Sequence, residues 1–100
     1  MKSNAKNRIM MWRSPVVSEV KASATDRRAW ITLSREEDQI VMVEFEHVKT
    51  LRSGQHIDPD EVLDRRVSRF ATLPEAIDAL TARGIDTDRF DAPAKVGYPL

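Results

Sequence analysis

Two neighbouring segments, residues 29–33 and 39–46, repeat their side-chain character at every second position, and the charged connection 34–38 joins them. A period of two with β-branched and aromatic residues is typical of β-strands. The residues that share a side are Ala29, Ile31 and Leu33 in the first segment, and Val41, Val43 and Phe45 in the second. An isolated hairpin is only marginally stable in water, so a third or fourth strand is expected.

The segments 8–13 and 16–22 are the candidates for these further strands. Pro15 separates them, because a proline cannot donate to a strand ladder. The polar residues 23–26 predict the turn that leads into the hairpin. Residues 1–7 hold nothing that needs burial and predict a flexible basic arm.

The clearest helix signal lies in the second half of the chain. Thr72 and Glu75 have the spacing of a capping box, in which each side chain accepts a backbone hydrogen bond at the helix start. Gly84 has the place of a left-handed C-terminal cap, with Ile85 after it. These signals predict a helix over 73–83.

A second helix is predicted over 59–66, with Asp58 as its N-cap and Pro59 at its first position. The following residues, 67–71, fit a helix or a strand equally well. The last segment, 91–100, contains two prolines and one glycine and predicts an irregular tail.

Strands followed by helices, without alternating units, indicate the α+β class. We expect an antiparallel sheet of three to four strands with one or two helices on one face. A chain of 100 residues with 41% hydrophobic residues suits one domain, predicted over 8–90. There is no cysteine, which excludes disulfides and thiolate zinc sites. The apolar run 9–12 is too short for a signal peptide or a membrane span, so a cytoplasmic protein with no membrane partner is expected.

Charge is segregated along the chain although it sums to zero. Residues 1–35 hold eight basic and two acidic side chains, whereas residues 36–64 hold nine acidic and two basic ones. Residues 65–100 are almost balanced, with six basic and five acidic side chains. Such a distribution influences which partners a surface attracts.

The acidic hairpin is the main candidate for a binding surface. Alternation places Ile40 and Met42 on the same outward side as the strand carboxylates, and apolar residues beside charged ones are typical of protein interfaces. Two alternatives remain open: Lys21, Arg27 and Arg28 lie opposite the acids as cross-strand pairs, or helices cover the apolar residues. The candidate partner-binding residues are Glu36, Glu37, Asp38, Ile40, Met42, Glu44 and Glu46.

The leading hypothesis is therefore a small non-enzymatic protein-binding domain. Its sharpest form is an inhibitor or immunity-type protein that neutralises a basic partner, such as a nuclease toxin, through the acidic hairpin. Neither a cofactor nor a metal is expected, and the oligomeric state stays open.

Two alternatives differ in class. In the first, the basic arm binds nucleic acid while Trp12 or Trp30 stacks on a base, although a pI of about 6.7 is low for such a protein. In the second, a small enzyme or metal site surrounds His56, which lies close to several carboxylates, Asp58 among them. Their spacing matches neither a calcium loop nor a two-histidine helix, and helix capping explains the acids equally well.

Overall fold

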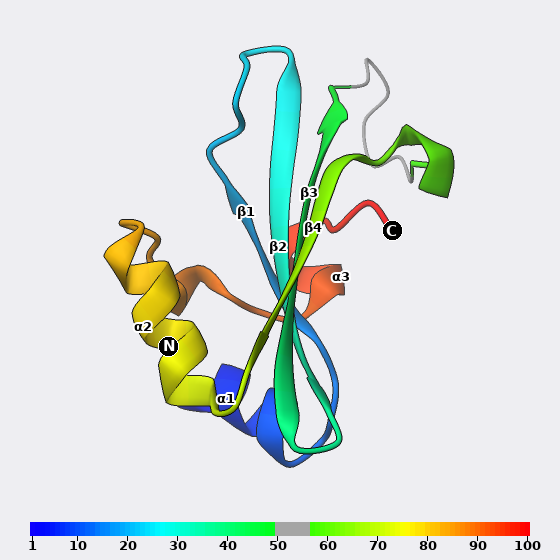
Figure 1. Ribbon diagram of the computed structural model, residues 1–100. Helices are drawn as coiled ribbons and strands as arrows, with labels where there is room; N and C mark the ends of the chain where they lie inside the picture. The colour runs from blue at the N-terminus through cyan, green and yellow to red at the C-terminus, as the bar shows by residue number, and fades with distance from the viewer. Residues whose placement is uncertain (50–56) are drawn as a thin grey trace.

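The computed structural model describes residues 1–49 and 57–100, and shows one four-stranded antiparallel sheet with helices on both sides (Figure 1). The strands are neighbours in chain order, β1-β2-β3-β4, so the sheet is a simple meander. This arrangement confirms the predicted α+β class. The elements are α1 (Ser3–Met10), β1 (Val16–Val20), β2 (Arg27–Glu36), β3 (Gln39–Val48), the 3-10 turn η1 (Pro59–Glu61), β4 (Leu63–Phe70), α2 (Leu73–Ala82), the 3-10 turn η2 (Thr87–Arg89) and α3 (Pro93–Val96).

The β2–β3 hairpin is longer and tighter than predicted. Its strands pair from Arg27 opposite Val48 to Glu36 opposite Gln39, which leaves a turn of only two residues. Glu37 in this turn has a φ of 53°, the left-handed conformation that two-residue hairpin turns require. The charged residues 34–36 therefore extend the strand instead of forming a loop.

One face of the sheet packs against α1 and α2. The register places Leu33 opposite Met42, and antiparallel partners point to the same face. Ile40 and Met42 are accordingly only 2% and 4% exposed, in the core that Ile31, Ala5, Ile9, Leu73, Ala76, Leu80 and Phe90 also form. The prediction that Ile40 and Met42 lie on an outward face is wrong, because the helices cover them.

The other face of the sheet is also covered, by residues from the C-terminal end. Trp30 and Phe45 pack there with Ile57, and Tyr98 meets both rings edge-on, at centroid distances of 5.6 and 5.9 Å. Figure 1 shows α3 and the C-terminus on the opposite side of the sheet from α2. Strands buried on both faces explain why β3 is apolar on both sides.

The C-terminal segment 91–100 is consequently not an irregular tail. Asp91 forms a β-bridge with Val17, the short helix α3 follows, and the backbone N–H of Ile57 donates to the carbonyl of Pro99 at 3.1 Å. The segment is ordered because it supplies the apolar side chains that close the second core.

The N-terminal residues form a helix instead of the predicted arm and strand. Ala5 and Ile9 are four positions apart, so they share one helical face, and both are buried against the sheet. The α-amino group of Met1 pairs with Asp88 at 3.0 Å. The prediction of a flexible arm over 1–7 and of a strand over 8–13 is therefore wrong.

The predicted helix over 59–66 is also wrong. Pro59 begins only the 3-10 turn η1, and within the described residues Asp58 makes no side-chain capping bond. The chain then enters β4, which extends to Phe70 and so resolves residues 67–70 as strand. Pairing with β3 outweighs the local helix signal, and a bulge with Asp64 at a φ of 51° interrupts this pairing.

The helix α2 confirms its local signals. The backbone N–H of Glu75 donates to Thr72 Oγ1 at 3.3 Å, and the N–H of Ala71 donates to Glu75 Oε2 at 3.2 Å. At its C-terminal end Gly84 has a φ of 77°, and the N–H of Ile85 donates to the carbonyl of Leu80, as in a Schellman motif.

A buried hydrogen bond links two side chains of the second core. The indole N–H of Trp30 donates to Nε2 of His47 at 3.0 Å, and His47 is buried. We expect His47→Ala to lower the free energy of unfolding by about 1–3 kcal/mol, because the indole N–H loses its acceptor. The matched variant His47→Gln keeps an acceptor oxygen near Nε2 and is expected to cost less. Urea unfolding measures both, and equal losses would show that this bond contributes little.

Candidate protein-binding surface at the hairpin end

Two of the predicted site carboxylates are paired with arginines from other elements. Glu36 Oε2 accepts from Arg69 Nη1 at 3.0 Å, and Glu44 Oε1 accepts from Arg83 Nη2 at 2.7 Å. Arg69 comes from β4 and Arg83 from the end of α2, so both cations lie far from their partners in sequence. Each of these two acids is therefore already paired with a cation of the same domain.

Glu46 is held in the same way at the other end of β3. Its carboxylate accepts from the backbone N–H and the hydroxyl of Ser23, at 2.9 and 2.7 Å, and from Arg27 Nη1 at 3.3 Å. The hydrogen bonds from Ser23 are the main reason why the pKa of Glu46 lies below its ordinary value. The predicted cross-strand neutralisation is therefore confirmed for Arg27.

Arg28 does not pair with the acids of the hairpin. Its guanidinium makes two hydrogen bonds to Glu19 on β1, at 2.6 and 2.9 Å, and these lower the pKa of Glu19. The third cation, Lys21, makes no ion pair with any described residue.

Two acids of the predicted site remain unpaired. Glu37 and Asp38 form the hairpin turn, are exposed, and have no ion pair within residues 1–49 and 57–100. The turn itself is anchored: Arg35 Nε donates to the carbonyl of Glu37 at 3.1 Å, and its Nη1 donates to the carbonyl of Met10 at 2.8 Å. Arg35 thereby joins the hairpin turn to the end of α1.

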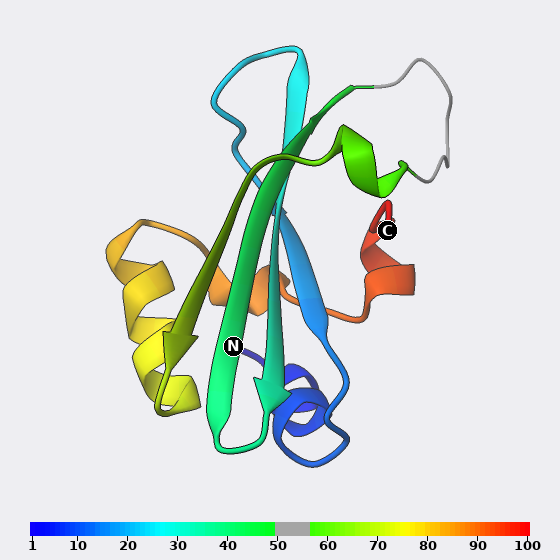
Figure 2. The same ribbon diagram turned by 45° about the vertical axis from the view of Figure 1, so that its right-hand side comes forward.

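The chain that leaves α1 presents large apolar side chains to solvent at this position. Met11 and Trp12 are each 74% exposed. Their backbone is ordered, since both N–H groups donate to the carbonyl of Asn7, at 2.8 and 3.2 Å. Figure 2 shows the end of α1 and the β2–β3 turn at the same end of the molecule. We call Met10, Met11, Trp12, Glu37 and Asp38 the hairpin-end surface.

The sequence identified only the acidic half of this surface. The sequence offers Trp12 only as a stacking residue of a nucleic-acid site, and the predicted strand over 8–13 includes Met10 and Met11. A short apolar run in a sequence does not show which of its residues are exposed. The exposure of Met11 and Trp12 follows from the helix α1, which the sequence did not predict. Trp30, the other tryptophan considered, is fully buried.

The metal hypothesis finds no support in the part of the chain that the structure describes. Those residues contain no group of three or more His, Cys, Asp or Glu side chains that could hold an ion. His56 lies outside the described residues. Asp64, one of the carboxylates that follow His56 in the sequence, pairs with Arg27 at 3.0 Å.

The fold and this surface define a small α+β domain with an exposed acidic and apolar end. No protein-family model, curated protein or solved structure matches the chain. Among the described residues, no helix has the length and apolar character needed to cross a membrane.

Proposed function

We propose that this chain is a small non-enzymatic protein-binding domain that recognises a basic partner through the hairpin-end surface. The observation that carries the proposal is the high exposure of Met11 and Trp12 on an ordered turn, at the same end of the molecule as two unpaired carboxylates. Tryptophan and methionine are enriched in protein interfaces, and tryptophan is among the commonest residues that dominate binding energy.

The carboxylates of Glu37 and Asp38 add selectivity to this contact. Unpaired acids at the tip of a hairpin attract a basic partner and raise the rate of association. The specific form of the proposal is an inhibitor or immunity-type protein that neutralises a basic nuclease toxin in the cytoplasm. Such a protein needs to associate rapidly with a basic partner. The nucleic-acid hypothesis depended on a flexible arm at residues 1–7, which belong mainly to the packed helix α1.

The test begins with capture of a partner on the immobilised wild-type protein from a lysate of the source organism, followed by binding kinetics with the purified partner. Trp12→Ala is expected to weaken binding by about 2–4 kcal/mol, as for an interface hot spot. Glu37→Lys with Asp38→Lys is expected to slow association, most strongly at low salt.

A matched control uses Asp60→Lys with Glu61→Lys, which changes the net charge equally at exposed positions of η1. This control should retain the wild-type on-rate. If both double variants slow association alike, the effect comes from net charge and the hairpin-end surface is not the site. Undiminished binding by Trp12→Ala would argue equally strongly against the proposal.

A further inference from the structure

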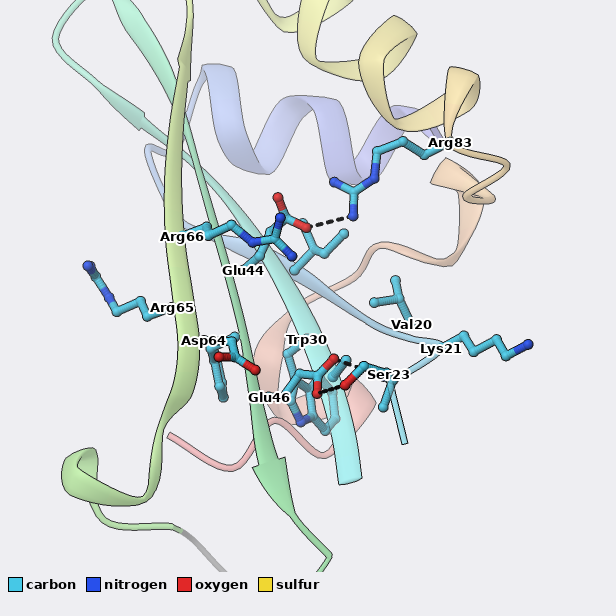
Figure 3. Close-up of a pocket in the computed structure, with 14 residues that line it drawn as sticks. Val20, Lys21, Ser23, Trp30, Glu44, Glu46, Asp64, Arg65, Arg66 and Arg83 are labelled. Carbon is cyan, nitrogen blue, oxygen red and sulfur yellow. Dashed lines mark hydrogen bonds and ion pairs between the residues drawn. The ribbon is translucent and has the colours of Figure 1, made fainter. Parts of the chain in front are cut away.

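A groove lies on the helix-covered face of the sheet, beyond the part that α1 and α2 cover (Figure 3). It has a volume of about 500 Å³. Ala29 and Ile31 of β2 are among the residues that line it. In Figure 3, β4 lies along one side of the groove, and Val20, Lys21 and Ser23 lie along the other. A groove of this size is open enough to receive side chains from another molecule.

The groove has more cations than its own acids neutralise. Glu44 and Glu46 are already paired with Arg83 and Arg27. In contrast, Arg65 and Arg66 on β4 form no ion pair with any residue in the described ranges. In Figure 3 the side chain of Arg66 points across the groove, while that of Arg65 points away from it. The unpaired charge along this wall favours an anionic occupant.

The same wall is an edge strand of the sheet. Among the described residues, β4 pairs with β3 and with no other strand. Its residues Arg65, Arg66, Val67 and Arg69 are exposed, Val67 to 43%. The opposite edge, β1, is partly closed because Asp91 bridges to Val17. Edge strands offer backbone N–H and C=O groups to an added strand, and arginines on the edge repel a basic strand but attract an acidic one.

We propose that β4 accepts an extended acidic segment of a partner protein as a fifth strand of the sheet. The register with β3 defines the pattern of this segment, since Glu44 lies opposite Arg66 and Val43 opposite Val67. Arg66 therefore lies on the groove side and Val67 on the other. The added strand carries acidic side chains on the groove side, beside Arg66, and apolar side chains beside Val67.

A second copy of this chain fits the edge poorly. Antiparallel pairing of two β4 strands would bring Arg65 and Arg66 of both copies into one interface. The carboxylate of the strand, Asp64, is already paired with Arg27 at 3.0 Å and cannot offset them fully. Like charges that face each other across strands are destabilising, so charge selects an acidic partner over self-association.

The experiment uses a fluorescent eight-residue peptide of alternating glutamate and valine as the probe, with fluorescence anisotropy and backbone NMR as readouts. The wild-type protein is expected to bind it saturably, with amide shifts concentrated on β4. Arg65→Glu with Arg66→Glu should weaken binding at least about tenfold, since like charges replace attractive ones. Lys2→Glu with Lys6→Glu changes the net charge equally on the exposed side of α1 and should leave binding unchanged.

Further peptides and variants decide the mode of binding. A peptide N-methylated at every residue keeps its charges but has no backbone N–H to donate to the ladder from either edge, so it should not bind. Equal binding would mean anion capture without strand addition and would overturn the proposal. A wild-type dimer that excludes the peptide would also overturn it, as would tighter binding of a lysine–valine peptide. If the charge-reversal variant does not fold, the milder pair Arg65→Gln with Arg66→Gln replaces it and should also weaken binding.

Trp12→Ala should leave peptide binding intact, which separates this site from the hairpin-end surface.

Discussion

Trp30→Ala is expected to lower the free energy of unfolding by about 3–5 kcal/mol, the range for removing a large aromatic side chain from a core. Trp30 is fully buried in the middle of β2 and meets Tyr98 edge-on at 5.6 Å. The substitution also removes the hydrogen bond from the indole N–H to His47. It removes the ring over which the guanidinium of Arg28 lies, at 5.0 Å from the ring centroid. Packing, a buried hydrogen bond and a cation–π contact are therefore removed together.

The second tryptophan is a matched control for this measurement. Trp12→Ala makes the same chemical change at a side chain that is 74% exposed, and should alter the free energy of unfolding by no more than about 0.5 kcal/mol. Because the chain has two tryptophans, each variant retains one fluorophore for urea titration. Similar losses in the two variants would contradict the assignment of Trp30 to the core and Trp12 to the surface.

Deletion of residues 93–100 is expected to lower the free energy of unfolding by at least as much, about 3–6 kcal/mol, because it exposes apolar area of Trp30 and Phe45 to water. The deletion removes α3, Tyr98 and the hydrogen bond at 3.3 Å between the hydroxyls of Thr32 and Tyr98. Since small domains are stable by only about 5–15 kcal/mol, the shortened protein should be close to unfolding at room temperature.

Thermal unfolding and amide hydrogen exchange measure this effect. Exchange should accelerate most in β2 and β3, which lose the cover on one face. Deletion of Leu100 alone is the control, because this residue is about half exposed, and it should leave the melting temperature nearly unchanged. If the two deletions gave the same melting temperature, the C-terminal segment would not be part of the core.

The elements that the sequence predicted well are those that local chemistry determines. The β2–β3 hairpin is visible in its period of two, and α2 in the caps at Thr72 and Gly84. In contrast, α1 depends on Ala5 and Ile9, two residues that become a stripe only when a sheet is present to cover them. The segment before β4 has a helix-like signal at Pro59, but the residues after it form a strand because β3 offers a long-range partner, which no local pattern reports.

The candidate site shows the same division. The acids of the hairpin are evident in the sequence, but their partners are not: Glu36 pairs with Arg69, and Glu44 with Arg83, across more than thirty positions. The burial of Ile40 and Met42 depends on the presence of helices on that side of β3. Both sides of this strand are apolar, so alternation could not distinguish a covered face from an open one.

The double hydrogen bond of Arg35, to the carbonyls of Glu37 and Met10, has a thermodynamic consequence for recognition. It connects the hairpin turn and the turn after α1 before any partner arrives. The conformational entropy of these residues is then lost during folding, so that association need not repeat the loss. Under the proposed function, this preorganisation means that the surface binds its partner with little rearrangement.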